Sequence, residues 1–212
     1  MATNSNPPAP ASAPTAIILA GGQSRRLGRD KALEEIDGKP LLEYVAHALS
    51  SLTDDIVLVE SPGASRLLPE LGQNVRRVVD DPPNRGPLGG LQAGLAASRS
   101  DAAWVVACDM PFVDGRLLTH MAGAIDGWDA VVPVWKGRNQ PVCAMYSMSI
   151  LPKISELLGG ADVSMQALIR AIRTRNLSED ELLTMGVTDE AFLNVNAEID
   201  LERVRELLQS RS

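Results

Sequence analysis

The sequence predicts a three-layer α/β domain with a mainly parallel sheet, and two observations carry this prediction. Short runs of apolar and β-branched residues alternate with longer segments of helical periodicity, which is the pattern of βαβ units. The short runs are apolar throughout, as expected for strands that are covered on both faces. With 212 residues, of which 45% are apolar, the chain can bury a core without help from disulfides or metals.

The expected elements follow from this alternation. Strands are expected at residues 15–20, 55–60, 75–79, 102–108 and 129–134, with helices between them at 40–52, 88–98, 115–125 and 152–158. Beyond residue 135 the pattern favours a strand at 140–147, a helix at 164–173, a short strand at 192–196 and an amphipathic helix at 197–209. No linker divides this region, so residues 15–212 are expected to form a single domain.

The start of the chain and its charge indicate the cellular setting. Residues 1–14 are rich in Pro, Ala, Ser and Asn and lack the basic start of a signal peptide. We expect a disordered tail on a cytoplasmic protein without a membrane segment. The net charge of −7 argues against a nucleic-acid partner. Cys108 and Cys143 lie in apolar runs, which favours reduced core thiols over a disulfide.

The loop after the first expected strand has the composition of a phosphate site. In open α/β sheets ligands gather beyond the carboxyl ends of the strands. The loop GGQSRRLGRDK begins with Gly21 and Gly22 and carries Arg26 and Lys31. Glycine N–H groups can form an anion nest, while Arg and Lys bind phosphates as a fork and a point charge. We interpret the loop as a triphosphate-binding site rather than a turn with solvated basic side chains, although it matches neither the GxGxxG nor the P-loop motif.

A second loop, VVDDPPNRGPLGGL at residues 78–91, joins a strand end to a helix start. Asp80 ends the strand, and Gly86 precedes the helix. An aspartate at this place can accept hydrogen bonds from ribose hydroxyls or base amines, and a Gly-rich helix start offers N–H donors at close range. An ordinary turn that contains an acidic residue is the alternative.

The third loop, VVACDMP, places Asp109 where a buried strand ends. A carboxylate there is well placed to hold Mg²⁺, which usually takes one or two protein carboxylates together with phosphate oxygens and waters. Capping of the next helix is the other reading, but Asp114 suits that role better. We therefore expect Asp109 to be a metal ligand.

The fourth segment, NVNAEIDLERV, carries Asn194 and Asn196 two residues apart. On an extended segment their side chains would share a face and could complete a metal shell or bind polar ligand groups. Asn196 could equally be the N-cap of the helix that follows.

Three further features have weaker readings. The segment WKGRNQP at residues 135–141 suits a second anionic ligand or a solvated loop. His47 and His120 lie in expected helices and are read as structural histidines, since no Ser or Cys nucleophile is patterned with them.

Five segments, LAGGQSRRLGRDKA, DDPPNRGPLGG, CDMP, QPVCAMY and NVNAEIDL, occur in this order along the chain. Together they resemble the molybdenum cofactor guanylyltransferase family of the Rossmann-like nucleotidyltransferases, over residues 15–209. The resemblance implies transfer of GMP from GTP to the phosphate of molybdopterin that carries molybdenum, with Mg²⁺ as the cofactor and pyrophosphate as the second product.

The resemblance also implies roles for individual residues. Arg26, Lys31 and Asp109 would be catalytic, the first two by neutralising phosphates and the third by binding Mg²⁺. The nucleotide would contact Leu19, Ala20, Gly21, Gly22, Lys31, Asp80, Gly86 and Asp109, and the pterin substrate would contact Gln140, Pro141, Asn194 and Asn196.

Departures from the family pattern occur at three places. Leu27 stands where Met is usual, Ala197 replaces a common Thr, so the helix start there is expected to be capped differently, and Glu60 and Ser61 do not match a family asparagine that helps to hold the nucleotide.

Several alternatives remain open at this point. A cytidylyltransferase acting on the same pterin and a sugar-phosphate or polyol-phosphate nucleotidyltransferase belong to the same class, although the AGGQ start resembles the guanine-specific branch. A non-catalytic relative would be expected to lose Asp109 or Lys31, and both are present. A molybdenum-insertion protein and molybdoenzyme chaperones are the expected protein partners, and a pull-down that recovers neither under expressing conditions would contradict this expectation.

Overall fold

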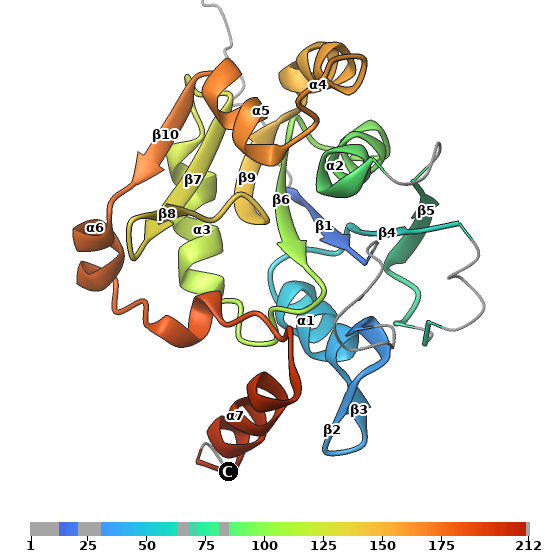
Figure 1. The fold of residues 1–212 in the computed structure, drawn as a ribbon, viewed down its shortest axis with the longest axis vertical. Coiled ribbons are helices and arrows are strands. Elements are labelled where there is room, and N and C mark those ends of the chain that lie inside the picture. The colour runs from blue at the N-terminus through green and yellow to red at the C-terminus, as the bar shows by residue number, and fades with distance from the viewer. Residues whose placement is uncertain (1–12, 21–30, 63–67, 70, 81–84, 211–212) are drawn as a thin grey trace, which may run out of the picture.

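A computed structural model of the chain describes residues 13–20, 31–62, 68–69, 71–80 and 85–210. These residues form one large mixed sheet with the strand order β10-β7-β9-β6-β1-β4-β5, and β8 pairs with β7 (Figure 1). The strands are β1 (Thr15–Leu19), β4 (Ile56–Glu60), β5 (Val75–Val79), β6 (Ala102–Ala107), β7 (Ala130–Trp135), β8 (Arg138–Asn139), β9 (Cys143–Ser147) and β10 (Thr174–Leu177). The pairs β1–β4, β1–β6, β4–β5 and β7–β10 are parallel, whereas β9 is antiparallel to both β6 and β7. The predicted mainly parallel sheet is confirmed.

Helices cover both faces of this sheet because successive strand residues point to opposite sides. Ala16 and Ile18 of β1 belong to one core cluster, together with residues of α1 and α3. Ile17 and Leu19 belong to a second cluster on the other face, together with residues of α2, α4 and α5. The helices are α1 (Leu41–Ser50), α2 (Gly86–Ala96), α3 (Gly115–Ala124), α4 (Leu151–Leu158) and α5 (Met165–Ala171). The three-layer α/β fold is therefore confirmed.

Close approach of α2 to the sheet depends on Gly94. A Cβ atom at this position would lie 2.5 Å from Cγ2 of Ile17 on β1, far inside van der Waals contact. Because Gly94 has no side chain, the backbone of α2 packs directly against β1. The start of α2 is thereby brought toward the ends of β1 and β4.

A third, smaller core cluster joins two segments that are far apart in sequence. The hairpin of β2 (Glu35–Ile36) and β3 (Lys39–Pro40) turns through Asp37 and Gly38, whose φ angles are 52° and 74°, as a type I′ turn requires. Ile36 of this hairpin packs with Leu201 and Val204 of α7 (Glu198–Gln209). Figure 1 shows α7 and the hairpin at the same end of the molecule.

The prediction of a short strand at residues 192–196 is wrong. Residues 189–192 form the 3-10 helix η4 (Asp189–Phe192), and residues 193–196 are in no strand. The amide nitrogens of Asn194 and Asn196 donate to the backbone carbonyls of Phe192 and Asn194 at 3.0 and 3.4 Å. These local bonds replace the strand ladder that alternation alone suggested.

The other expected elements are present, with ends shifted by a few residues. The short hairpin, β8 and β10 were not predicted, nor were the 3-10 helices η1 (Lys31–Leu33) and η3 (Met148–Ile150) or helix α6 (Glu179–Thr184). In the part of the chain that the structure describes, no helix is both long and apolar enough to span a bilayer. The division into a tail over residues 1–14 and one domain over 15–212 stays a prediction.

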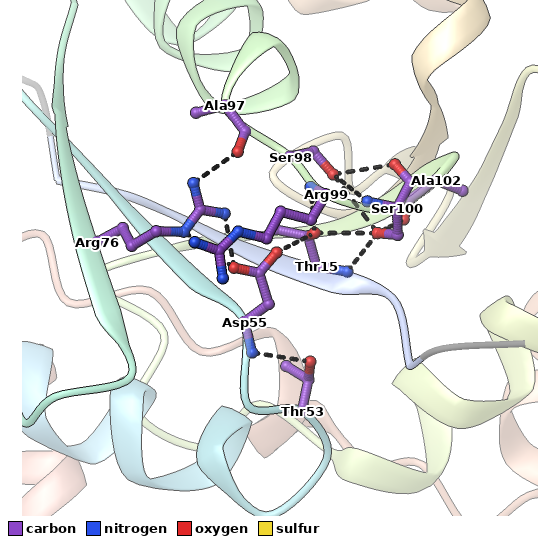
Figure 2. A network of polar contacts seen from close by, with 9 residues as sticks. All are labelled: Thr15, Thr53, Asp55, Arg76, Ala97, Ser98, Arg99, Ser100 and Ala102. Atoms are coloured by element: carbon purple, nitrogen blue, oxygen red, sulfur yellow. Dashed lines mark hydrogen bonds and ion pairs between the residues drawn. The ribbon is translucent and has the colours of Figure 1, made fainter.

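A polar network ties the amino ends of the strands together (Figure 2). Thr15 Oγ1 donates to Asp55 Oδ2 at 2.6 Å, and Arg76 donates to Asp55 Oδ1 through Nε at 3.0 Å and Nη2 at 2.6 Å. Arg76 Nη1 also donates to the carbonyl of Ala97 at 2.7 Å, and the Thr15 N–H donates to Ser100 Oγ at 2.7 Å. Desolvation opposes the charge of Asp55, but the bonds from Thr15 and Arg76 outweigh it and hold the pKa of this carboxyl below its ordinary value.

Replacing Asp55 with Asn should lower the free energy of unfolding by about 2 kcal/mol at pH 7, because Thr15 and Arg76 lose a charged acceptor. The contribution of Asp55 is present above the unfolded-chain pKa of about 3.9 and is lost as the pH falls through the lower folded pKa. Urea titrations should therefore show the difference from wild type shrinking below about pH 4. As a control, Glu156→Gln breaks only an exposed pair with Lys153 and should change stability by less than about 0.5 kcal/mol. Equal effects of the two variants would contradict the prediction.

Candidate active site

The carboxyl ends of β1, β4, β5 and β6 meet at one edge of the sheet. From β1 the chain proceeds outward through β4 and β5 and then returns to the other side of β1 as β6. This reversal is a topological switch point, where open α/β sheets bind ligands. The Cys108 N–H donates to the carbonyl of Leu19 at 3.1 Å, and the Ala20 N–H donates to that of Val59 at 2.9 Å. Leu19 and Ala20 therefore lie at the carboxyl edge beside the switch point, and their contact with a nucleotide stays a prediction.

Asp80 and the start of α2 are neighbours at this edge. The Asp80 N–H donates to the carbonyl of Glu60 at 2.9 Å, which extends the β4–β5 pairing. The Asp80 carboxylate lies over the first turn of α2, since a Cβ at Gly89 would be 2.9 Å from Asp80 Oδ1. Gly86, with φ of 62°, opens the helix and is exposed. An acceptor thus stands beside helix N–H donors, an arrangement suited to a sugar or base and its phosphate.

Asp109 lies just beyond β6, at the switch point. The residue is half-buried, and its Oδ1 atom is buried. The helix-capping alternative for Asp109 is excluded because Asp114 caps α3, accepting from the Arg116 N–H at 2.8 Å. Among the described residues no group of three or more His, Cys, Asp or Glu is arranged to hold a metal. One carboxylate completed by phosphate oxygens and waters nevertheless fits the usual shell of Mg²⁺.

Gln140 and Pro141 reach the same edge because β9 runs antiparallel to β6. Val106 pairs with Cys143, and the Ala107 N–H donates to the carbonyl of Val142 at 2.9 Å. Residues 140–142, which lead into β9, therefore lie beside the carboxyl end of β6, close to Asp109. Buried Tyr146 fixes this entry, donating its hydroxyl to the carbonyl of Pro141 at 2.8 Å.

The NVN segment contacts the metal-ligand candidate directly through the backbone. The Val195 N–H donates to the carbonyl of Asp109 at 3.0 Å, so Asn194 and Asn196 flank a residue that is attached to the β6 loop. Both asparagines are half-buried. The structure thus brings Asp109, Asn194 and Asn196 together, although without the extended conformation expected from the sequence.

The N-cap interpretation of Asn196 is wrong. The N-cap residue of α7 is Ala197, which has no side-chain acceptor. Asp200 replaces it: Oδ2 accepts from the Asn196 N–H at 2.8 Å and from the Ala197 N–H at 2.9 Å. An acid three residues into a helix is the signal that could have identified Asp200 from the sequence.

An ion pair between buried Glu60 and exposed Arg77 lies at the position where the family asparagine was missing. Glu60 is fully buried, and its Oε1 lies 3.1 Å from Nη1 of Arg77. Arg77 also donates through Nη2 to the carbonyl oxygens of Leu68 and Pro69. The charged pair joins the end of β4 to β5, and the bonds from Arg77 to Leu68 and Pro69 attach the segment before β5. The sequence analysis did not predict this pair.

Four predicted site residues lie wholly or partly outside the described residues. Gly21, Gly22 and Arg26 lie outside the described residues, and of Lys31 only the backbone, at the start of η1, is described.

His47 and His120 are exposed on α1 and α3. Cys108 and Cys143 are buried, and burial followed by the charge of Asp114 raises the pKa of Cys143 to about 12, as expected for an unreactive core thiol.

Comparisons with known proteins identify the class of protein to which this fold belongs. A family model described as "MobA-like NTP transferase domain" matches residues 16–177. The chain is 34% identical over 198 residues to a molybdenum cofactor guanylyltransferase of Desulfosudis oleivorans, with 92% of this chain and 96% of that protein covered. It is 33% identical over 196 residues to a probable molybdenum cofactor guanylyltransferase of Pelotomaculum thermopropionicum, with 92% and 94% covered.

A solved structure supports the fold. Molybdopterin-guanine dinucleotide biosynthesis protein A from Archaeoglobus fulgidus superimposes with a TM-score of 0.79 at 24% identity, covering 92% of this chain and 99% of that chain. Fold and family together define a nucleotidyltransferase. Within this class the chain belongs to the molybdenum cofactor guanylyltransferase family, so the predicted enzyme class and family are confirmed.

Asp200→Ala should lower the free energy of unfolding by about 1 kcal/mol, because two N–H groups at the start of α7 lose their acceptor. Ala197→Ser should raise it by about 0.5–1 kcal/mol, because the extended backbone of residue 197 suits a side-chain cap. Urea titrations of both variants measure these changes. No effect of Asp200→Ala would mean that Asp200 does not hold the segment.

Proposed function

We propose that the chain transfers GMP from GTP to the terminal phosphate of molybdopterin that carries molybdenum, giving the guanine dinucleotide form of the cofactor and pyrophosphate. The observation that carries this proposal is the hydrogen bond from Val195 to Asp109. This bond joins residues 194–196, which are expected to contact the acceptor, to Asp109, which is expected to bind Mg²⁺ together with the nucleotide. The names of relatives that match 92% of the chain support the same substrates.

The reaction needs no nucleophile from the protein. An oxygen of the acceptor phosphate attacks the α-phosphorus of GTP, a new P–O–P bond forms, and the bond to the leaving pyrophosphate breaks. Both reactants are anions, so the protein must align them and offset their charge. Arg26 and Lys31 would draw charge toward the leaving group, and this role accounts for so basic a loop in an acidic chain.

The nucleotide would lie across the ends of β1, β5 and β6. Leu19, Ala20, Gly21 and Gly22 would support it through their backbone, and Gly86 would allow it to approach the start of α2 closely. Asp80, beside this helix start, would accept hydrogen bonds from guanosine donors.

Asp109 would hold Mg²⁺ together with phosphate oxygens. When bound, the ion supplies positive charge that favours attack at the α-phosphate. On the acceptor side, Gln140, Pro141, Asn194 and Asn196 would position the pterin beside Asp109. Asn194 uses its amide nitrogen on the Phe192 carbonyl, which leaves its amide oxygen as the acceptor for a pterin N–H.

The test incubates purified protein with molybdopterin carrying molybdenum, Mg²⁺ and each of the four NTPs in turn, and measures pyrophosphate and dinucleotide product. GTP alone should support turnover, and Asp109→Asn should remove most of it, whereas Asp101→Asn, exposed at the other end of β6, should be unaffected. Turnover with CTP would instead assign the cytidylyltransferase alternative, and none with any NTP would indicate another acceptor or a non-catalytic relative.

Lys31→Ala should reduce kcat by roughly two to three orders of magnitude, in line with the loss of a transition-state donor. Lys39→Ala, an exposed lysine on the neighbouring hairpin, serves as the matched control and should retain kcat within about twofold. A near-normal rate for Lys31→Ala would remove this lysine from the mechanism.

A further inference from the structure

A hollow of about 440 Å³ opens beside the acceptor side of the site. Its walls come from the β7–β8 turn, from η4 and the residues that follow it, and from α7. Gln140 and Asn194, both predicted to contact the substrate, are among its lining residues. Since the neighbour of Asn194 in the chain is bonded to Asp109, the hollow extends the active site away from the nucleotide.

The hollow has an excess of positive charge. Lys136, Arg138 and Arg203 line it, and Asp189 is the one carboxylate among its described lining residues. Asp189 already has partners: Lys136 Nζ lies 2.6 Å from Oδ1, and Trp135 Nε1 donates to the same oxygen at 2.7 Å. These bonds, with the charge of Arg203, lower the pKa of Asp189, so it is an anion that Lys136 neutralises.

Two guanidinium groups remain to attract a ligand. In the part of the chain that the structure describes, neither Arg138 nor Arg203 forms a salt bridge with a carboxylate. Both residues are exposed, and they approach the hollow from different elements, β8 and α7. Arginine favours flat or multi-oxygen anions because its donors are arranged as a planar fork.

The floor of the hollow is aromatic. The rings of Trp135 and Phe192 have centroids 5.3 Å apart, and each residue is 8% exposed. A surface of this kind favours a planar, apolar-faced group over a simple hydrated ion. Positively charged side chains beside buried aromatic rings suit a ligand that is a flat heterocycle and also carries negative charge.

From this combination we propose that the hollow binds the body of the acceptor that lies beyond its reacting phosphate, with Arg138 and Arg203 as specificity-determining residues for its anionic sulfur and metal group. This inference rests on the proposed function, because it takes molybdopterin as the acceptor. The phosphate reaches Asp109, the pterin ring lies between Gln140 and Asn194 over the aromatic floor, and the two arginines hold the distal charge.

The kinetic test compares Arg138→Gln and Arg203→Gln with wild type, and uses Arg205→Gln as the matched control. Arg205 lies on the same helix as Arg203 but pairs with Glu198 at 3.8 Å and does not line the hollow. Each hollow variant should raise KM for the acceptor about tenfold or more, the effect of losing a charge-assisted hydrogen bond, and leave KM for GTP within about twofold. An unchanged acceptor KM in both variants would overturn the proposal, as would an equal rise for Arg205→Gln, which would indicate general charge attraction instead of a site.

A binding measurement separates this proposal from the proposed function. Tryptophan fluorescence follows titration of the protein with molybdopterin, with and without molybdenum, in the absence of nucleotide and Mg²⁺. Wild type should bind the metal-loaded form more tightly, and the two hollow variants should lose most of this preference. If no NTP supports turnover, but wild type prefers metal-loaded molybdopterin and the variants lose this preference, then the proposed function is contradicted and the proposal about the hollow is supported. If turnover occurs but the variants keep the preference, only the hollow proposal fails.

Discussion

Parallel pairing of β1 with strands on both of its sides is the constraint on which the rest of the structure depends. β1 lies between β4 and β6, and the chain reverses its direction of travel across the sheet at this strand. The carboxyl ends of β1 and β6 are therefore brought together, although about ninety residues separate them in sequence. Backbone pairing alone therefore places Leu19 and Ala20, at the end of β1, beside the segment that carries Asp109, as the bond from the Cys108 N–H to the carbonyl of Leu19 shows.

The C-terminal part of the chain completes this arrangement. The Val195 N–H bonds to the Asp109 carbonyl, Asp200 holds the turn that follows, and α7 packs on the β2–β3 hairpin through Leu201, Val204 and Ile36. That hairpin follows directly after η1, which begins at Lys31. One continuous set of contacts thus connects the segment assigned to the acceptor with the backbone that carries the lysine assigned to the phosphates.

The sequence predicted the layers better than the details of the site. The buried strands were predictable because they are long apolar runs, whereas β10 (Thr174–Leu177) contains polar, partly exposed residues and gains its identity by pairing with β7. The positions of Asp80 and Asp109 followed from strand ends. Asn194 was given the wrong conformation because its geometry depends on a tertiary bond. Arg203 was not predicted at all, since an arginine on the polar side of a helix reads as solvated until packing places it beside the β7–β8 turn.

The antiparallel strand β9 has a consequence for how such an enzyme can change. In a purely parallel sheet each strand contributes only its exit loop to the carboxyl edge, but β9 begins at this edge and contributes its entry, residues 140–142. The carboxyl edge of the sheet therefore has two parts. The first is formed by the ends of β1, β4 and β5, and the second by the β7–β8 turn and the residues that lead into β9. Under the proposed function, substitutions in the second part would alter which molecule receives the nucleotide while the strands that form the first part keep their sequence, so that donor and acceptor recognition could diverge on a single sheet.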